Sequence, residues 1–271
     1  MTDNARNTCR LCNGLLTEKF SNTILQKHTI QYYQCNICES LQTEEPYWLE
    51  EAYAELDFNL DTGALQRNIN NFAICFTISQ IFSVKIAVDY GAKDGILCRF
   101  LRDHEINCFA YDRYSKPGYV IDFTNPPEDD VDLLMAFEVL EHLPNPSINL
   151  DEIFAFKPKY FLCSTDLYSD QGSDWWYLAK EGGQHVFFYS PAAINFIAQK
   201  YGYGVTQIGG MLFFYKPEIP NIQNMIISAQ TALSGWIFQA IKSYIFLLPT
   251  NGHILDNQQV RAKLTHNHRN Q

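Results

Sequence analysis

The sequence has 271 residues, 46% of them hydrophobic, which is enough for one α/β domain with a sizeable core and a small additional region. Its formal net charge of −10 at pH 7 disfavours a nucleic-acid partner, because broad contact with phosphates requires a basic surface. Residues 1–8 are polar, so no signal peptide is expected. The spacing of the eight cysteines favours a reduced, cytoplasmic protein over a disulfide-bonded one.

Two identical Cys-x-x-Cys knuckles, separated by 22 residues, lie near the start of the chain. Each knuckle turns two thiolates toward one point, so the pair is typical of a closed tetrahedral zinc site that folds a region too small for its own core. The predicted zinc ligands are Cys9, Cys12, Cys35 and Cys38. A redox-active pair is the competing interpretation, but it would need only one knuckle beside a strand–helix unit. His28 is expected in an exposed loop.

An acidic and aromatic segment, residues 46–61, follows the second knuckle and includes Tyr47, Trp48, Tyr53 and Phe58. We expect a helix and a loop that link the zinc module to the main domain. The alternative is that this segment forms a wall of the active site. Residues 65–82 then show helical spacing of apolar side chains, which predicts a helix packed on a sheet.

The stretch from Val84 to Asp112 carries the pattern around which the chain is organised. An apolar run ends in Asp89, a glycine-punctuated turn follows, then a helix-period segment, and a second apolar run ends in Asp112. Strand, turn, helix and strand in this order form the opening half of a nucleotide-binding α/β unit, and an acid after the second strand suits ribose hydroxyls.

The turn itself, from Asp89 to Gly95, reads D-x-G-x-x-x-G. A dinucleotide site needs G-x-G-x-x-G so that amide groups face the pyrophosphate. Here Asp89 and Asp94 bring two carboxylates, which suit a cationic, amine-bearing ligand, while Gly91 and Gly95 allow the backbone to approach it. The alternative is a glycine turn that binds nothing.

Two further strand candidates end in polar side chains. Residues 119–123 predict a third strand, where Asp122 and Phe123 either flank an adenine or serve as a strand-end acid and a core ring. Residues 132–137 predict a buried fourth strand, and the polar residues Glu138, Glu141 and His142 follow it with the spacing of one helical turn. The carboxyl ends of parallel strands are where such sheets hold ligands, although a Glu–His pair is also common as a structural pair.

The remaining core elements are a helix at 148–156, a fifth strand at 160–164, a helix after Ser190 and Pro191, and a closing hairpin around residues 209–210. Residues 166–183 form a long loop with three adjacent aromatic residues, Trp175, Trp176 and Tyr177. This loop predicts a substrate lid, or an anchor that holds the loop on the core. His185 lies just beyond it.

Over residues 9–216 the sequence resembles the class I S-adenosylmethionine (SAM) methyltransferases. The segments that carry the resemblance are DYGAKDG, AYD, DLLMAFEVLEHLPNP, FLCSTDLY and WWYLAKEGGQHVFFYS. The resemblance is to a branch with an N-terminal cysteine-knuckle module that is commonly associated with sugars or surface glycans. It implies an α/β fold with a Rossmann-like, seven-stranded sheet whose last two strands are antiparallel. Lys93 stands where the family usually has its middle glycine.

By this resemblance, Asp89, Gly91 and Gly95 hold the methionine and ribose parts of SAM, and Asp112 holds the ribose hydroxyls. Asp122 and Phe123 flank the adenine, and Phe137 and Glu138 line the floor of the cofactor site. Methyl transfer is an in-line displacement in which positioning dominates, and an acceptor hydroxyl or carbon also needs a base. His185 and His142 are the candidates, with His185 slightly favoured.

We therefore expect three parts: a zinc module and linker at 1–60, a methyltransferase domain at 61–216, and an apolar helix with a polar, disordered tail at 217–271. Residues 225–248 are too interrupted to span a membrane and are expected to dock on the core, on a second copy of the chain, or on a membrane surface. The predicted activity is methyl transfer to a small polar acceptor such as a sugar or glycan precursor. The alternative is a non-catalytic partner protein in which Lys93 blocks the cofactor, and an RNA substrate is disfavoured by the charge.

Overall fold

The computed structural model describes residues 8–54, 62–127 and 130–269. The N-terminal module is an antiparallel sheet built from β1 (Leu16–Ile24), β2 (His28–Cys35) and β3 (Leu41–Thr43). A fourth strand, β8 (Phe187–Phe188), comes from far along the chain and pairs with β3. The short helix α1 (Leu49–Ala54) follows, and residues 55–61, the second half of the predicted linker, lie outside the described residues. The module therefore shares its sheet with the segment directly after His185.

The central sheet has the strand order β5-β4-β6-β7-β10-β9. Its strands are β4 (Ile86–Tyr90), β5 (Asn107–Tyr111), β6 (Leu133–Ala136), β7 (Tyr160–Cys163), β9 (Gly204–Ile208) and β10 (Met211–Tyr215). The first four are mutually parallel, and β10 is antiparallel to both β7 and β9. The predicted Rossmann-like α/β class with an antiparallel closing hairpin is confirmed.

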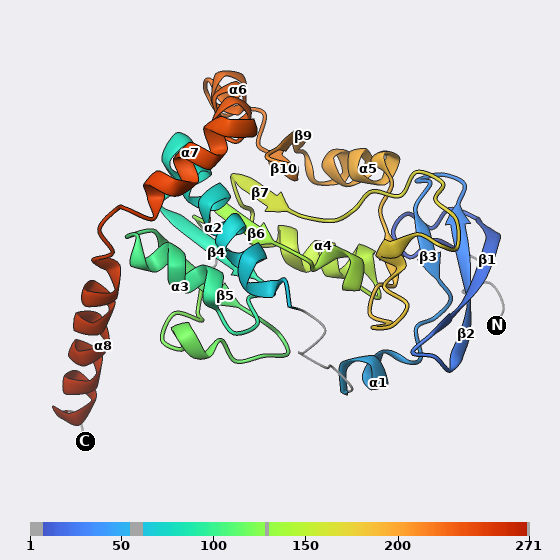
Figure 1. The fold of residues 1–271 in the computed structure, drawn as a ribbon, viewed down its shortest axis with the longest axis horizontal. Helices are drawn as coiled ribbons and strands as arrows, with labels where there is room; N and C mark the ends of the chain where they lie inside the picture. The colour runs from blue at the N-terminus through green and yellow to red at the C-terminus, as the bar shows by residue number, and fades with distance from the viewer. Residues whose placement is uncertain (1–7, 55–61, 128–129, 270–271) are drawn as a thin grey trace.

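Side chains of the central strands alternate between two apolar cores, as the twofold period of a strand requires. Ala87 and Met135 face the core that contains α2 (Ala64–Ile81), α3 (Ile96–Asp103), α6 (Ile222–Ala232) and α7 (Gly235–Ile245). Val88 and Ala136 face the core that contains α4 (Pro146–Phe154), α5 (Pro191–Tyr201) and the cysteine knuckles. The sheet is thus covered on both faces, with the N-terminal module at one side (Figure 1).

The predicted third strand at 119–123 is wrong, and the described part of this sheet has six strands rather than seven. Residues Gly118–Val120 form a 3₁₀ turn instead. The amide of Val120 donates to the carbonyl of Pro117 (3.0 Å), and the amide of Phe123 donates to the carbonyl of Val120 (2.8 Å). These local bonds use the donors that a strand would offer to its neighbour.

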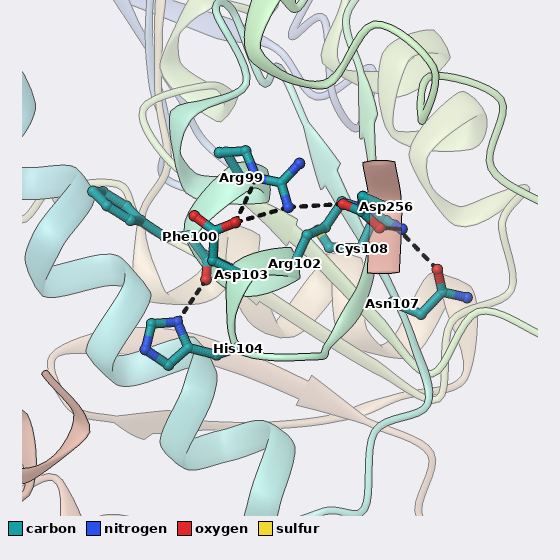
Figure 2. Close-up of polar contacts among 8 residues, drawn as sticks. All are labelled: Arg99, Phe100, Arg102, Asp103, His104, Asn107, Cys108 and Asp256. Carbon is teal, nitrogen blue, oxygen red and sulfur yellow. Dashed lines mark hydrogen bonds and ion pairs between the residues drawn. The ribbon is translucent and has the colours of Figure 1, made fainter. Parts of the chain in front are cut away.

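The C-terminal region also differs from the expectation. The apolar stretch at 225–248 forms two helices, α6 and α7, separated by residues 233–234, and α7 begins at Gly235, whose φ of 45° is left-handed. The tail expected to be disordered forms α8 (Gly252–Arg269). It projects from the body in Figure 1, but Asp256 anchors its start to Arg99 and Arg102 of α3 (Figure 2). No helix in the described ranges combines the length and hydropathy needed to cross a bilayer.

Candidate active site

The four predicted zinc ligands come together in the N-terminal module. The Sγ atoms of Cys9 and Cys38 lie 3.6 Å apart, those of Cys12 and Cys35 lie 3.5 Å apart, and all four lie within 4.8 Å of one another. A tetrahedral zinc with Zn–S bonds of about 2.3 Å places its sulfurs about 3.8 Å apart, so the donor set fits zinc. The amides of Leu11 and Ile37 donate to Cys9 and Cys35 sulfurs, which orients each knuckle.

The glycine turn lies at the carboxyl end of β4. Gly91 and Gly95 have left-handed φ values of 77° and 81°, and an added Cβ would lie 2.6 Å from Val139 or from Val120. Only glycine therefore fits at either position. The backbone of Gly91 is exposed, and so is Lys93, which places Lys93 on the solvent side of the turn rather than in the core.

Asp89 is buried at the end of β4, with 5% of its surface exposed. Burial and, to a smaller extent, the charge of Asp112 outweigh a hydrogen bond from the backbone of Cys98, and the net effect raises the pKa of the Asp89 carboxyl to about 7. A cationic ligand beside Asp89 would favour its ionised form. The contact of Asp89 with an amine-bearing cofactor stays a prediction.

The carboxylate of Asp112 binds backbone amides of two neighbouring loops. Its carboxylate accepts hydrogen bonds from the amides of Lys93 (2.8 Å), Tyr114 (2.8 Å) and Ser115 (2.7 Å). A carboxylate has about four acceptor positions, so roughly one remains for a ribose hydroxyl. The bond to Lys93 joins the end of β5 to the glycine turn, a role that the sequence did not indicate.

The two predicted adenine neighbours are placed differently from each other. Asp122 is exposed, whereas Phe123 is buried with the guanidinium of Arg102 3.4 Å from the centre of its ring. Arg102 therefore occupies one face of Phe123. The structure uses this ring in the core, and its contact with adenine stays a prediction.

Phe137 and Glu138 follow β6, at the carboxyl-end edge of the sheet where the glycine turn follows β4. Glu138 is exposed and has a left-handed φ of 55°, so it precedes the 3₁₀ turn Leu140–His142 rather than sharing a helical face with it. The hydroxyl of Ser164, just beyond β7, donates to Oε1 of Glu138 (2.8 Å) and accepts from its amide (3.0 Å). Ser164 is a site residue that the sequence analysis missed.

The fold brings His142 and His185 together. Their ring centroids lie 4.8 Å apart, with the rings edge to face. Nδ1 of His185 lies 2.7 Å from the carbonyl oxygen of Tyr177, and Nδ1 of His142 lies 3.4 Å from the hydroxyl of Tyr53. Because a carbonyl only accepts, Nδ1 of His185 carries the proton, and Nε2 of the neutral ring keeps its lone pair.

Glu141 completes this cluster. It is fully buried, and ligand-type atoms of Glu141, His142 and His185 all lie within 4.8 Å of one another. The hydroxyls of Tyr177 and Thr165 lie near this carboxyl and lower its pKa, although neither makes a well-aligned hydrogen bond to its oxygens. Burial, and after it the neighbouring Glu138, outweigh them and together raise the pKa of Glu141 to about 8, so this carboxyl is largely protonated at neutral pH.

The aromatic loop serves mainly as an anchor. Tyr177 is buried, and Trp175 lies against Phe188 with ring centroids 5.5 Å apart, whereas Trp176 is 74% exposed. From the other side, α1 brings Tyr53 to His142. That residues 46–61 form a wall of the active site stays a prediction.

Residues 61–208, more than half of the chain, match the family described as "Methyltransferase domain", and the chain belongs to that family. It is a SAM-dependent methyltransferase. The family match implies SAM as the cofactor, and its contacts with the turn at Asp89–Gly95 and with Asp112 stay predictions. No curated protein matches the chain.

Several solved structures share part of the fold. The methyltransferase domain of bacterial CtHen1 is 18% identical over 55% of this chain and 98% of that one, with a TM-score of 0.41. A SAM-dependent methyltransferase from Thermotoga maritima is 14% identical over 59% and 97%, with a TM-score of 0.38. An O-methyltransferase family protein from Burkholderia thailandensis is 13% identical over 52% and 53%, with a TM-score of 0.36. With such low scores, these likenesses carry no argument about the acceptor.

Proposed function

We propose that this methyltransferase acts on a small polar acceptor, a sugar or glycan precursor, and that His185 is the general base that removes the acceptor's proton during in-line transfer. The acidic chain disfavours a polyanionic acceptor such as RNA. Exposed Tyr53 offers an aromatic face beside His142, and exposed Trp176 offers another next to Tyr177; such faces suit the apolar faces of a sugar. The sugar preference rests on this chemistry and on the sequence resemblance.

The observation that carries the base assignment is the hydrogen bond from Nδ1 of His185 to the carbonyl of Tyr177 (2.7 Å). It fixes the tautomer, so that Nε2 can accept a proton. Burial lowers the pKa of His185 below its ordinary value, and burial and the nearby His185 lower that of His142 to about 3. Both rings are therefore neutral at pH 7, as a base must be before it acts.

The test begins with calorimetric titration of SAM and its demethylated product into the zinc-loaded protein, followed by a mass-spectrometric screen of nucleotide sugars for added methyl groups. In His185→Gln, kcat should fall by about 10²–10⁴-fold while product affinity stays unchanged, because the base acts on the acceptor. The control is His104→Gln, since His104 is bonded to the Phe100 carbonyl away from the cluster. Full activity in His185→Gln would exclude His185 as the base.

A pH profile provides a second check. Because burial lowers the pKa of His185, kcat/KM should stay level as the pH falls to about 6.5, the ordinary histidine value, and should decline only below it. A decline that begins well above pH 7 would contradict a base whose pKa is lowered.

A further inference from the structure

The segments that carry the two histidines are both bound by one side chain of the cysteine-knuckle module. Nη1 of Arg10 donates to the carbonyl of Pro144 (3.1 Å), two residues after His142. Nη2 of Arg10 donates to the carbonyl of Val186 (2.7 Å), the residue after His185. The planar guanidinium can donate to both acceptors at once because its N–H groups form a rigid fork.

Arg10 is itself held by the knuckle in which it lies. It stands between Cys9 and Cys12, its amide donates to Oε1 of Gln42 (2.9 Å), and its carbonyl accepts from the amide of Ser147 (3.3 Å). Nη2 also contacts the carbonyl and hydroxyl oxygens of Thr43 on β3, at 3.1 Å and 3.3 Å. The position of the guanidinium is therefore set by the module, and any shift of the knuckle moves the fork.

The two terminal nitrogens of the Arg10 guanidinium are enclosed by oxygen atoms of three segments. Four carbonyl and hydroxyl oxygens take up its two terminal nitrogens. Charge-assisted hydrogen bonds to buried carbonyls are stronger than neutral ones, so the fork restrains both segments.

The two segments also touch each other directly. The amide of Val186 donates to the carbonyl of Glu141 (2.9 Å), and the hydroxyl of Tyr189 donates to the carbonyl of Leu140 (3.2 Å). Loss of Arg10 would therefore shift the histidines by a small amount rather than separate them. Displacements of about 1 Å are enough to cost a reaction about 10²-fold, because the reacting atoms must be aligned.

We propose that Arg10 is a positioning residue for the acceptor side of the active site, and that through it the four-cysteine module sets the geometry of His142 and His185. The inference rests on the proposed function of His185 as the base. It gives the module a role in the reaction beyond stabilising its own fold. Arg10 touches no reacting atom and acts through the two backbone carbonyls.

The test compares Arg10→Lys, which keeps the charge but loses the fork, with Lys19→Met as a matched control. Lys19 is also a module cation that bonds across to the central domain, at Asp170 (2.6 Å), but it does not bind either histidine segment. We expect kcat to fall by about 10–100-fold in Arg10→Lys with product affinity within about twofold of wild type. Lys19→Met should leave both values unchanged.

A second readout does not depend on activity. Long-range ¹H–¹⁵N spectra of the imidazoles should show Nδ1 of His185 protonated in the wild type, and the His142 and His185 ring signals should shift in Arg10→Lys but not in Lys19→Met. Unchanged ring signals in a folded Arg10→Lys protein, or a loss of kcat that only follows the folded fraction, would overturn the proposal. If Arg10→Lys does not fold, Gln42→Met, which removes the acceptor for the Arg10 amide, takes its place under the same criteria.

The two proposals fail in different ways. If the wild-type protein transfers methyl to no acceptor, the proposed function fails, while the ring spectra still decide whether Arg10 positions the histidines. If transfer occurs and His185→Gln abolishes it, yet Arg10→Lys and Gln42→Met leave the rings and kcat unchanged, only the role of Arg10 is refuted.

Discussion

At the scale of single residues, Glu141 is a buried acid beside the histidines. Its carboxyl is fully buried, and its oxygens make no well-aligned hydrogen bond within the described ranges, although Tyr177 and Thr165 lie near enough to lower its pKa. Its folded pKa is raised from 4.5 to about 8, mainly by burial. The folded protein therefore binds a proton that the unfolded chain releases between these pH values, so stability falls as the pH rises from about 4.5 to 8.

Replacement of this carboxyl by an amide should remove the pH dependence. Glu141→Gln should be as stable as the wild type near pH 4.5 and more stable by up to about 4 kcal/mol at pH 8, because Gln cannot ionise. Urea denaturation at the two pH values measures the difference. A Glu141→Gln protein that gains nothing at pH 8 would show that the wild-type carboxylate is compensated in solution.

A second residue-scale prediction concerns the cofactor. Asp112→Ala removes the acceptor for the amides of Lys93, Tyr114 and Ser115 and the predicted ribose ligand, so the affinity for SAM should fall at least about tenfold. Asp112→Asn keeps one acceptor oxygen and should lose less. Calorimetric titration with the demethylated product measures both, and wild-type affinity in Asp112→Ala would remove this residue from the cofactor site.

At the scale of elements, α8 depends on a buried ion pair. Asp256 accepts hydrogen bonds from Arg102 at 2.7 Å and 2.8 Å and from Arg99 at 2.7 Å (Figure 2). Burial alone would raise the pKa of Asp256, but the bonds from Arg102 and Arg99 outweigh it and hold the pKa below 3.8. The stabilisation is thus present above pH 3.8 and is lost as the pH falls through the lower folded value.

Asp256→Ala should destabilise the protein by about 3 kcal/mol, because it leaves the Arg102 guanidinium buried without its counter-charge. Asp103→Ala is the matched control, since Asp103 pairs with Arg99 at the surface and should cost at most about 1 kcal/mol. Urea denaturation measures the free energy of unfolding of both variants. An equal decrease in the two would show that the buried ion pair stabilises the protein no more than the Arg99–Asp103 pair does. Hydrogen exchange of α8 amides reports whether the helix undocks.

At the scale of the whole molecule, the cysteine module and the central domain form one structure, because β8 completes the module's sheet directly after His185. Further hydrogen bonds cross the same boundary. The indole of Trp48 donates to the carbonyl of Gly183 (2.7 Å), and the hydroxyl of Ser190 donates to the carbonyl of Cys38. Metal loss should therefore reach the active site as well as the module.

The purified chain should contain about one zinc per molecule, and Cys38→Ser should lose it and unfold at a lower temperature, because the site would keep three thiolates. Elemental analysis and thermal denaturation measure the two effects. Cys98→Ala, a change to a core cysteine outside the cluster, should keep the metal. Full zinc content in Cys38→Ser would contradict the four-thiolate site.

The sequence by itself determined the features that depend on neighbouring residues. The spacing within each Cys-x-x-Cys knuckle predicted its turn, and the apolar runs predicted strands β4 to β7. Helix α5 begins where Ser190 and Pro191 predicted it, and the Ser190 hydroxyl accepts a hydrogen bond from the Ala193 amide (3.0 Å). Asp89 and Asp112 were found because parallel strands place their carboxyl ends at one edge. These are local or topological consequences of pattern.

Only the tertiary structure decided which distant groups meet. The contact of His142 with His185, the fork of Arg10 and the burial of Phe123 under Arg102 each join segments whose separation along the chain carries no periodic signal. Two wrong expectations concern the same kind of detail: the amides of Val120 and Phe123 donate within local turns, and the polar tail forms a helix in which Asp256 pairs with a buried arginine. Packing and long-range pairing override local propensity because burial changes the cost of each polar group.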